Sequence, residues 1–179
     1  VVIVVGYKQE KIINLLGDNY NGLKIKYIVN EVYDRTDCIY SLWLAREESK
    51  NGFIVINSDT LFNKDILKNL INSKYPDVAV VDDQKLRLDE DSMKVTLKEG
   101  LIVEISKEVF FENAHAHAIG LYKFSRLGAA AYFNEIGKLV ERKVMGVHHM
   151  VPMNNFVKSN DLHILSTNGL SWIEIDTPT

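Results

Sequence analysis

Two short stretches of the sequence place a carboxylate just after an apolar run. Residues 53–62 read FIVINSDTLF and reach Asp59, and residues 172–178 read WIEIDTP and reach Asp176. In open α/β sheets ligands bind beyond the carboxyl ends of the strands, so both acids are expected at such an edge. Two carboxylates that meet there can hold Mg²⁺, the ion that phosphoryl or nucleotidyl transfer uses to neutralise phosphate charge. The alternative is that each Asp forms an Asx turn or a helix cap.

The elements that must position these acids alternate between strands and helices in the first half of the chain. Residues 1–5 are a β-branched run that ends at Gly6, as in a strand buried on both faces. Comparable patterns predict strands at 23–29, 53–56 and 78–81, with helices at 8–16, from about 37 to 46, and at 63–71. Strands separated by helices of this length indicate βαβ crossovers and a mostly parallel sheet.

The pattern changes after Asp82. Residues 93–97 and 101–105 alternate with period two around Glu99 and Gly100, which predicts an antiparallel hairpin. Further strands are expected at 118–124, 163–165 and 172–175, with a long helix after Ser125 and a segment at 147–157 that contains Pro152. No repeat or linker divides the chain, so residues 1–179 are expected to form one α/β domain.

Several motifs taken in order resemble a known enzyme family. They are VVGY, YIVNEVYDRTDCIYSLWLA, GFIVINSDTLF, LDEDSMKV with ISK, AIGLYKFS and WIEIDTP. The set, which covers nearly all of the chain, is similar to the nucleotidyltransferases that activate phosphocholine, aminoethylphosphonate, inositol phosphate or sugar phosphates with CTP or another nucleoside triphosphate. The similarity is closest to the cytidylyltransferases. It implies a Rossmann-like, three-layer nucleotidyltransferase fold and Mg²⁺-dependent attack of a phosphate or phosphonate oxygen on the α-phosphorus, with release of pyrophosphate.

The same resemblance implies roles for individual residues. Asp59 and Asp176 match the acids that hold the metal, and Lys107 in ISK joins them as a catalytic residue. Lys94 in MKV and Lys107 match basic residues near the substrate phosphate, where a flexible point charge is a suitable partner. Together with His117 they form the expected substrate site. The expected nucleotide-binding residues are Asn30, Tyr33, Thr36 and Ser41.

The chain departs from the family pattern in three places. The glycine-rich loop and its following Lys, which cradle the triphosphate, are not in these 179 residues, so we expect an incomplete domain that is inactive as given. Asp37 stands where the family more usually has Asn. His115 and His117 stand where Gly-Glu-Tyr is common; on one face of a strand they could bind a transition metal or simply border the substrate cleft.

Composition narrows the class of partner. The formal charge is −3, from 24 acidic and 21 basic residues spread along the chain, which argues against nucleic acid or an anionic membrane surface. The single Cys38 favours a reducing, cytoplasmic setting and is expected to be a small apolar residue without a partner base. His148 and His149 are expected to point apart on a helix. The apolar hairpin offers a surface for a homodimer.

Three functions are consistent with these features. The leading one is transfer of CMP from CTP to a small phosphorylated or phosphonate substrate. The second is a sugar-phosphate nucleotidyltransferase that uses UTP or dTTP. The third is a non-catalytic binding or assembly module on the same scaffold.

Overall fold

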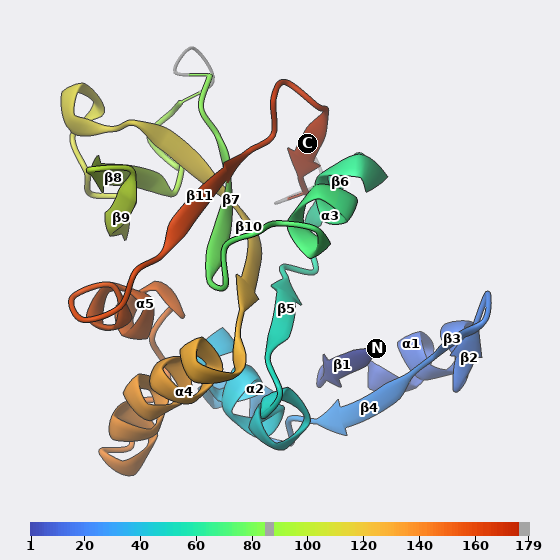
Figure 1. Ribbon diagram of the computed structural model, residues 1–179. Helices are drawn as coiled ribbons and strands as arrows, with labels where there is room; N and C mark the ends of the chain where they lie inside the picture. Colours follow the sequence, from blue (N-terminus) through green and yellow to red (C-terminus); the bar gives the residue numbers. More distant parts are fainter. Residues whose placement is uncertain (85–87, 176–179) are drawn as a thin grey trace.

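The computed structural model describes residues 1–84 and 88–175 (Figure 1). Its main sheet has six strands in the order β5-β10-β7-β11-β9-β8, with β8 also pairing with β10. The strands are β5 Phe53–Ile56, β7 Val78–Asp82, β8 Lys94–Lys98, β9 Leu101–Ser106, β10 Ala116–Phe124 and β11 His163–Ser166. Asp176, one of the two predicted metal ligands, lies outside the described residues.

Strand β10 changes the pairing that the sequence predicts. Strands β7 and β11 are parallel, but β10 lies between β5 and β7 and is antiparallel to both. Strands β5, β7 and β11 therefore share one direction, as predicted, although the sheet as a whole is mixed. The reason is that the β8–β9 hairpin precedes β10, so that β10 begins at the edge where β7 ends. The α/β fold class is confirmed, and the mostly parallel pairing is not.

Three smaller strand pairs flank this sheet. Strands β1 Val2–Val5 and β4 Lys26–Val29 are parallel, and helix α1 Gln9–Leu16 lies between them in the chain. Strands β2 Asn19–Tyr20 and β3 Leu23–Lys24 form a short hairpin that, with β1, β4 and α1, projects to one side of the main body (Figure 1). Strands β6 Thr60–Phe62 and β12 Trp172–Glu174 are antiparallel and lie next to helix α3 Lys64–Ile71.

Helices cover both faces of the main sheet. On β7, Ala79 and Val81 belong to one buried apolar cluster, whereas Val78 and Val80 belong to a second. The second cluster contains residues of α3, and the first contains residues of α2 Cys38–Leu44, α4 Arg126–Glu141 and α5 Met150–Phe156. Because successive side chains of a strand point to opposite faces, this alternation defines the three layers that the resemblance implied.

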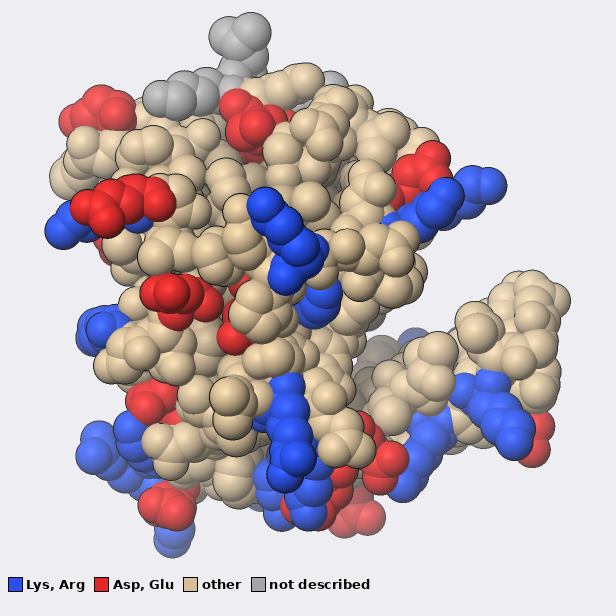
Figure 2. Space-filling view, in the orientation of Figure 1, with Lys and Arg blue, Asp and Glu red and all other residues tan. Residues whose placement is uncertain are grey.

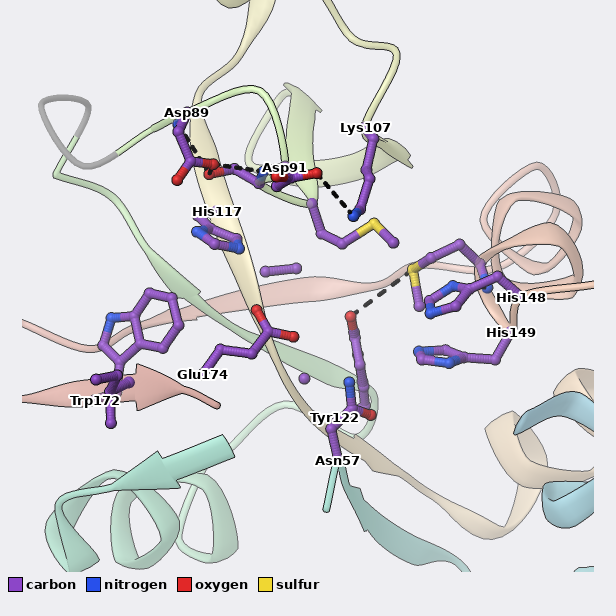
Figure 3. A pocket seen from close by; sticks show the side chains of 16 residues that line it. Asn57, Asp89, Asp91, Lys107, His117, Tyr122, His148, His149, Trp172 and Glu174 are labelled. Atoms are coloured by element: carbon purple, nitrogen blue, oxygen red, sulfur yellow. Dashed lines mark hydrogen bonds and ion pairs between the residues drawn. The ribbon is translucent and has the colours of Figure 1, made fainter. Parts of the chain in front are cut away.

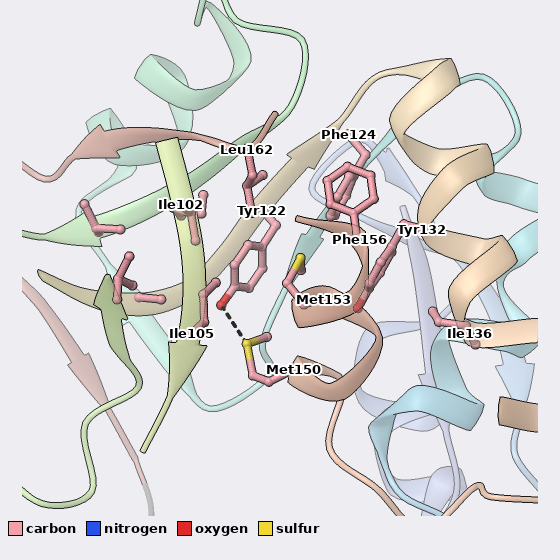
Figure 4. Packing of buried hydrophobic residues seen from close by; sticks show 14 of the residues in the cluster. Ile102, Ile105, Tyr122, Phe124, Tyr132, Ile136, Met150, Met153, Phe156 and Leu162 are labelled. Atoms are coloured by element: carbon pink, nitrogen blue, oxygen red, sulfur yellow. Dashed lines mark hydrogen bonds between the residues drawn. The ribbon is translucent and has the colours of Figure 1, made fainter. Parts of the chain in front are cut away.

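Aromatic rings form the centre of the larger cluster (Figure 4). The ring of Phe124 on β10 stacks on that of Tyr132 on α4, with centroids 4.8 Å apart, and meets Phe156 of α5 edge-on at 5.6 Å. Offset and edge-on pairs of this kind add to the stabilisation from burial alone. They fix α4 and α5 against the sheet, and so place the start of α5 at one wall of the cavity described below.

The helix ends follow the sequence signals. Asn63 caps α3 by accepting a hydrogen bond from the backbone N–H of Asp65 (3.0 Å), and Ser125 caps α4 through Gly128 (3.0 Å). Pro152 lies in the first turn of α5, where its missing N–H has no intrahelical partner to lose. Within the described parts of the chain, no helix has both the length and the hydropathy to cross a membrane.

The charged side chains are mixed over the face seen in Figure 2. Lysine and arginine alternate there with aspartate and glutamate over both the main body and the projecting part. Several exposed pairs lie within ion-pair distance, such as Lys26 with Glu48 at 2.6 Å and Lys50 with Glu47 at 2.5 Å. Such pairs contribute little to stability because solvent screens them.

Candidate active site

A cavity of about 410 Å³ lies at the sheet edge where β7 ends and β10 begins (Figure 3). Its walls come from β10, the loop before β8, the start of α5, β12, and the residues just after β5 and β9. The polar and aromatic residues that line it include Asn57, Asp89, Asp91, Lys107, His117, Tyr122, His148, His149, Trp172 and Glu174. Polar groups that converge from separate elements on the carboxyl edge of an α/β sheet are typical of a ligand site.

A glycine shapes the floor of the cavity. Gly120 has φ of +81° and lies within a register shift of β10, between Ala118 and Tyr122. Its carbonyl accepts a hydrogen bond from the backbone N–H of Asn57 at 2.9 Å. A Cβ on Gly120 would lie only 2.7 Å from Nδ2 of Asn57. The glycine therefore permits both the local backbone and the close approach of Asn57, the residue that follows β5 by one position.

His117 occupies the wall formed by β10. The side chain is buried, and its ring meets that of Trp172 edge-on with centroids 5.0 Å apart. Burial lowers the pKa of His117, against the opposing effect of the nearby Asp89 and Asp82 carboxylates. The imidazole is therefore neutral at pH 7 and can accept a hydrogen bond or a proton. Trp172 is itself held in place because its Nε1–H donates to Oδ2 of Asp82 at 2.7 Å.

The loop before β8 forms another wall. Oδ1 of Asp89 accepts hydrogen bonds from the backbone N–H of Ser92 at 2.8 Å and from its hydroxyl at 2.6 Å, and these bonds hold the pKa of Asp89 below its usual range. Lys94 is 2% exposed, and its ammonium donates to the carbonyls of Asp89 (3.4 Å), Glu90 (3.1 Å) and Ser92 (3.3 Å). Lys94 thus supports the loop and does not line the cavity.

Lys107 differs from Lys94 in how firmly its ammonium is held. Its side chain lines the cavity and is about half exposed, with Nζ 3.4 Å from the exposed carboxylate of Asp91. An ion pair between two exposed side chains is weak, so this ammonium can exchange Asp91 for a phosphate oxygen at small cost. Of the two lysines that the sequence associates with the substrate phosphate, Lys107 is the one placed to reach it.

One carboxylate oxygen of Asp59 has unusual surroundings. Among the described residues, its Oδ1 is one of the few buried side-chain atoms without a hydrogen-bond partner. Leaving a buried carboxylate oxygen unpaired is costly, and a hard cation such as Mg²⁺ is the kind of partner that would satisfy it. The residue does not line the cavity within the described chain, but its charge acts on His148, which does. The oxygen that Asp59 offers is therefore of the kind that a magnesium ion binds.

Strand β12 brings a second acid to the same region. Glu174 pairs with Thr60 in the β6–β12 ladder, and the backbone N–H of Ile175 donates to the carbonyl of Asp59 at 2.8 Å. The ladder thus leads the chain past Asp59 directly before Asp176. Glu174 points into the cavity (Figure 3). The predicted site did not include Glu174, although its position two residues before Asp176 was a signal, because alternate residues of a strand share a face.

The predicted nucleotide-binding residues lie together at the end of β4. Asn30 is buried, and its Nδ2 donates to Oγ1 of Thr36 (3.1 Å) and Oγ of Ser41 (3.3 Å), while its Oδ1 accepts from the backbone N–H of Val32 (3.1 Å). Tyr33 is exposed and covers Gly6, where a Cβ would lie 2.7 Å from it. None of these predicted residues lines the described cavity. The three hydrogen-bonded residues hold the loop together, and their contact with a nucleotide stays a prediction.

The histidines are arranged differently from the expectation. His115 lies outside the cavity lining and its Nδ1 accepts a hydrogen bond from the backbone N–H of Leu97 at 3.3 Å, so it is not paired with His117. His148 and His149 precede α5 rather than lie within it, and their ring centroids are 4.3 Å apart. The expectation that they point apart on a helix is wrong because the helix begins only at Met150.

Cys38 also has a partner that the sequence did not reveal. Its Sγ lies 3.1 Å from Nδ1 of His149, and the backbone N–H of His149 donates to the same sulfur at 3.3 Å. Burial raises the pKa of the Cys38 thiol to about 12 and lowers the pKa of His149 to about 3. At pH 7 the pair is thus a neutral thiol beside a neutral imidazole. The contact joins residues 111 positions apart, which no local pattern could predict.

Comparisons with known proteins agree with this architecture. No family model matches the chain. Over 70 residues, 39% of this chain and 11% of the relative, it is 36% identical to a CMP-5'-(3-aminopropyl)phosphonate synthase from Streptomyces rubellomurinus. Over 99% of its length it is 25% identical to the bifunctional protein GlmU from Methanococcus vannielii, of which it covers 41%. The chain thus spans well under half the length of these curated relatives.

Solved structures extend the comparison to the whole fold. An inositol-1-phosphate CTP transferase from T. maritima matches with a TM-score of 0.73 at 20% identity, over 99% of this chain and 70% of that one. A CTP:phosphocholine cytidylyltransferase from Streptococcus pneumoniae gives 0.73 at 20% identity, over 98% and 72%. A UDP-glucose pyrophosphorylase gives 0.68 at 14% identity, over 92% and 71%.

These matches define the fold of the chain. The chain has the nucleotidyltransferase fold, which confirms the resemblance drawn from its ordered motifs. At identities of 20% or less the solved structures establish the fold and leave the reaction open. They include both CTP-dependent transferases and a UDP-glucose enzyme, so the fold is compatible with more than one nucleotide.

Proposed function

We propose that this chain forms part of a nucleotidyltransferase that transfers CMP from CTP to a small phosphate- or phosphonate-bearing substrate and releases pyrophosphate. The observation that carries the proposal is that Oδ1 of Asp59 is buried and has no hydrogen-bond partner among the described residues. Asp59 belongs to a chain with this fold and lies at the ladder that leads to Glu174 and the cavity. The choice of CMP is supported by the match to a CMP-phosphonate synthase and by the two CTP-dependent structures.

The acids would hold the metal. Asp59 and Asp176 are the proposed Mg²⁺ ligands, and Glu174 is placed to join them because it follows the same ladder. A magnesium ion bound there would neutralise charge on the triphosphate during transfer.

The other side chains bind and orient the reactants. Lys107, whose ammonium forms an exposed ion pair with Asp91, contacts the substrate phosphate or phosphonate. Neutral His117, on the wall formed by β10, accepts a hydrogen bond from the substrate. Lys94 acts on the substrate indirectly, because its ammonium is used to hold the loop between Asp89 and Ser92. The loop residues proposed to meet the nucleotide are Asn30, Tyr33, Thr36 and Ser41.

A sugar-phosphate nucleotidyltransferase is the second candidate. It is favoured by the match to a UDP-glucose pyrophosphorylase. The proposed roles of Asp59 and Lys107 are the same in both reactions, since both substrates present a phosphate to a nucleoside triphosphate. A non-catalytic binding module would keep the nucleotide site and release no pyrophosphate with any substrate.

Pyrophosphate release tests the proposal. The protein made from its complete reading frame is assayed with Mg²⁺ and each of CTP, UTP and dTTP, against phosphocholine, aminoethylphosphonate, inositol phosphate and glucose phosphate. Turnover with CTP and a phosphate or phosphonate alcohol or amine is the expected result. Turnover restricted to UTP or dTTP with glucose phosphate would select the second candidate, and binding without turnover would select the third.

A matched pair of variants then tests the metal site. Asp59→Asn keeps the shape of the side chain but removes its charge, and it should lower turnover by about 100-fold or more, since a metal supplies several kcal/mol of charge stabilisation. Asp161→Asn changes an exposed carboxylate outside the cavity and should leave turnover unchanged. Equal activity in the two variants would remove Asp59 from the mechanism.

A further inference from the structure

A second group of potential metal ligands lies at the cavity wall near α5. Cys38, His148 and His149 each offer one ligand atom, and these atoms all lie within 4.8 Å of one another. We call these three residues the Cys-His cluster. Both imidazoles line the cavity, where Figure 3 shows them side by side, so that an ion can reach the cluster from solvent. Nothing in the proposed transfer reaction uses them.

The backbone around the cluster is fixed from several sides. The N–H of Asp37 donates to the carbonyl of Met145 at 2.8 Å, and the N–H of His149 donates to Sγ of Cys38 at 3.3 Å. The buried hydroxyl of Tyr132 donates to the carbonyl of His149 at 3.2 Å. The start of α2 and the segment before α5 are therefore held together before any ion binds, which lowers the cost of ordering the ligands.

The geometry is close to that of a tetrahedral zinc site. Zinc binds thiolate at about 2.3 Å and imidazole at about 2.0 to 2.1 Å, so that its ligand atoms lie roughly 3.3 to 3.6 Å apart. Sγ of Cys38 and Nδ1 of His149 are already 3.1 Å apart. The remaining ligand separations need to close by no more than about 1.5 Å, which rotation of the His148 side chain can provide.

The chemistry of the donors selects the kind of metal. One sulfur and two imidazole nitrogens suit zinc and similar borderline ions, whereas Mg²⁺ prefers oxygen. The carboxylate of Asp37 acts on both imidazoles and adds negative charge beside the cluster. Its Oδ1 accepts a hydrogen bond from the backbone N–H of Cys38 at 2.6 Å, which holds that charge in place. The negative charge of Asp37 would favour the binding of a divalent cation at the cluster.

We propose that Cys38, His148 and His149 bind one zinc ion, with the fourth tetrahedral position open to the cavity. On binding, the bond between sulfur and hydrogen breaks, the thiol proton leaves to solvent, and sulfur and both imidazoles donate electron pairs to the metal. The ion links the start of α2 to the segment before α5. This site is distinct from the oxygen site at Asp59 and does not depend on the proposed transfer reaction.

Cobalt and zinc binding test the proposal without any nucleotide or substrate. The full chain, reduced and freed of metal by a chelator that is then removed, is titrated with Co²⁺ alone and then with Zn²⁺ alone. The expected result is one ion per chain, a thiolate-to-cobalt charge-transfer band, tetrahedral ligand-field bands, and displacement of cobalt by zinc. Cobalt that binds without a thiolate band overturns the proposal, as does the absence of binding.

Matched variants locate the ligands. Cys38→Ala and His148→Ala should each weaken zinc binding by more than about 100-fold, because even groups that only support metal ligands cost 10- to 100-fold when removed. His115→Ala removes a histidine outside the cluster and should bind zinc as the parent does. Equal zinc affinity in all three variants would mean uptake by surface groups only, which overturns the proposal. The cobalt spectrum of the parent decides the matter even where a variant fails to fold.

Discussion

The substitution Gly120→Ala tests how the floor of the cavity is built. Gly120 adopts φ of +81°, and an added Cβ would lie 2.7, 2.8 and 2.9 Å from Nδ2, Cγ and Cβ of Asn57. Rotation of the Asn57 side chain can move the first two atoms but not its Cβ. The backbone of Asn57 cannot move freely, because its N–H is bonded to the carbonyl of Gly120 itself. The contact must therefore be relieved by distorting the β10 bulge.

Two terms contribute to the expected loss of stability. A side chain in the left-handed region costs about 1 to 2 kcal/mol, and overpacking that forces a backbone shift costs about 1 to 3 kcal/mol. The free energy of unfolding should fall by about 2 to 5 kcal/mol in total, which lowers Tm by roughly 4 to 20 °C at about 2 to 4 °C per kcal/mol. Urea denaturation followed by the fluorescence of Trp43 and Trp172 measures the change.

Gly100→Ala is the matched control. Gly100 also has φ of +81°, but a Cβ placed there meets no atom within 4 Å, so this variant carries only the backbone term. The double variant Gly120→Ala with Asn57→Gly removes the contact and should recover most of the difference between the two single variants. If Gly120→Ala loses no more stability than Gly100→Ala, to within about 0.5 kcal/mol, the close packing of Asn57 on β10 is refuted.

Two further predictions concern titration and the two lysines near the cavity. With chelator present, acidification should destabilise the fold. The pKa of His149 is about 3 in the folded chain, against an ordinary value of 6.5. Between these two pH values the imidazole is protonated in the unfolded chain and not in the folded chain. The free energy of unfolding should fall by up to about 1.4 kcal/mol per pH unit from about pH 6 to pH 4. Urea denaturation measured across this range should show a smaller dependence of the unfolding free energy on pH in His149→Gln. An equal pH dependence in the two proteins would contradict the burial of a neutral imidazole. Lys94→Met should lower the free energy of unfolding by about 2 to 3 kcal/mol, because it leaves three carbonyls without their charged donor. Lys107→Met should change stability by less than about 0.5 kcal/mol and should instead raise KM for the phosphorylated substrate, measured by steady-state pyrophosphate release; the reverse pattern would exchange the two assignments.

The local signals in the sequence were sufficient for most of the elements. The apolar run at 78–81 and the alternation around Gly100 became β7 and the β8–β9 hairpin, and Asn63 and Ser125 cap the helices that were predicted to begin at those positions. These features depend on side-chain periodicity and on hydrogen bonds between near neighbours, which a sequence displays directly. The order of motifs likewise indicated the nucleotidyltransferase fold, which the solved structures confirm.

Such local signals could not predict how distant segments of the chain pair. Nothing local distinguishes a β10 that lies between β5 and β7 from one that lies at the sheet edge, because the choice depends on where the hairpin returns the chain. The same is true of Lys94, whose neighbours in the sequence mark it as a phosphate ligand although its ammonium is buried among loop carbonyls. Long-range packing decides which of two similar lysines faces the cavity.

By itself the sequence determined most of the alternation of strands and helices and the caps, and it led to the expectation that Asp59 follows a strand at a ligand-binding edge, since each depends on chemistry within a few residues. Only the tertiary structure decided that an oxygen of Asp59 is buried with no partner in the part of the chain that is described, that Glu174 enters the cavity, and that Cys38 meets His149. The physical reason is that desolvation and contact distance depend on the whole packed molecule. A residue's type fixes what it can donate or accept, and the fold fixes what it meets.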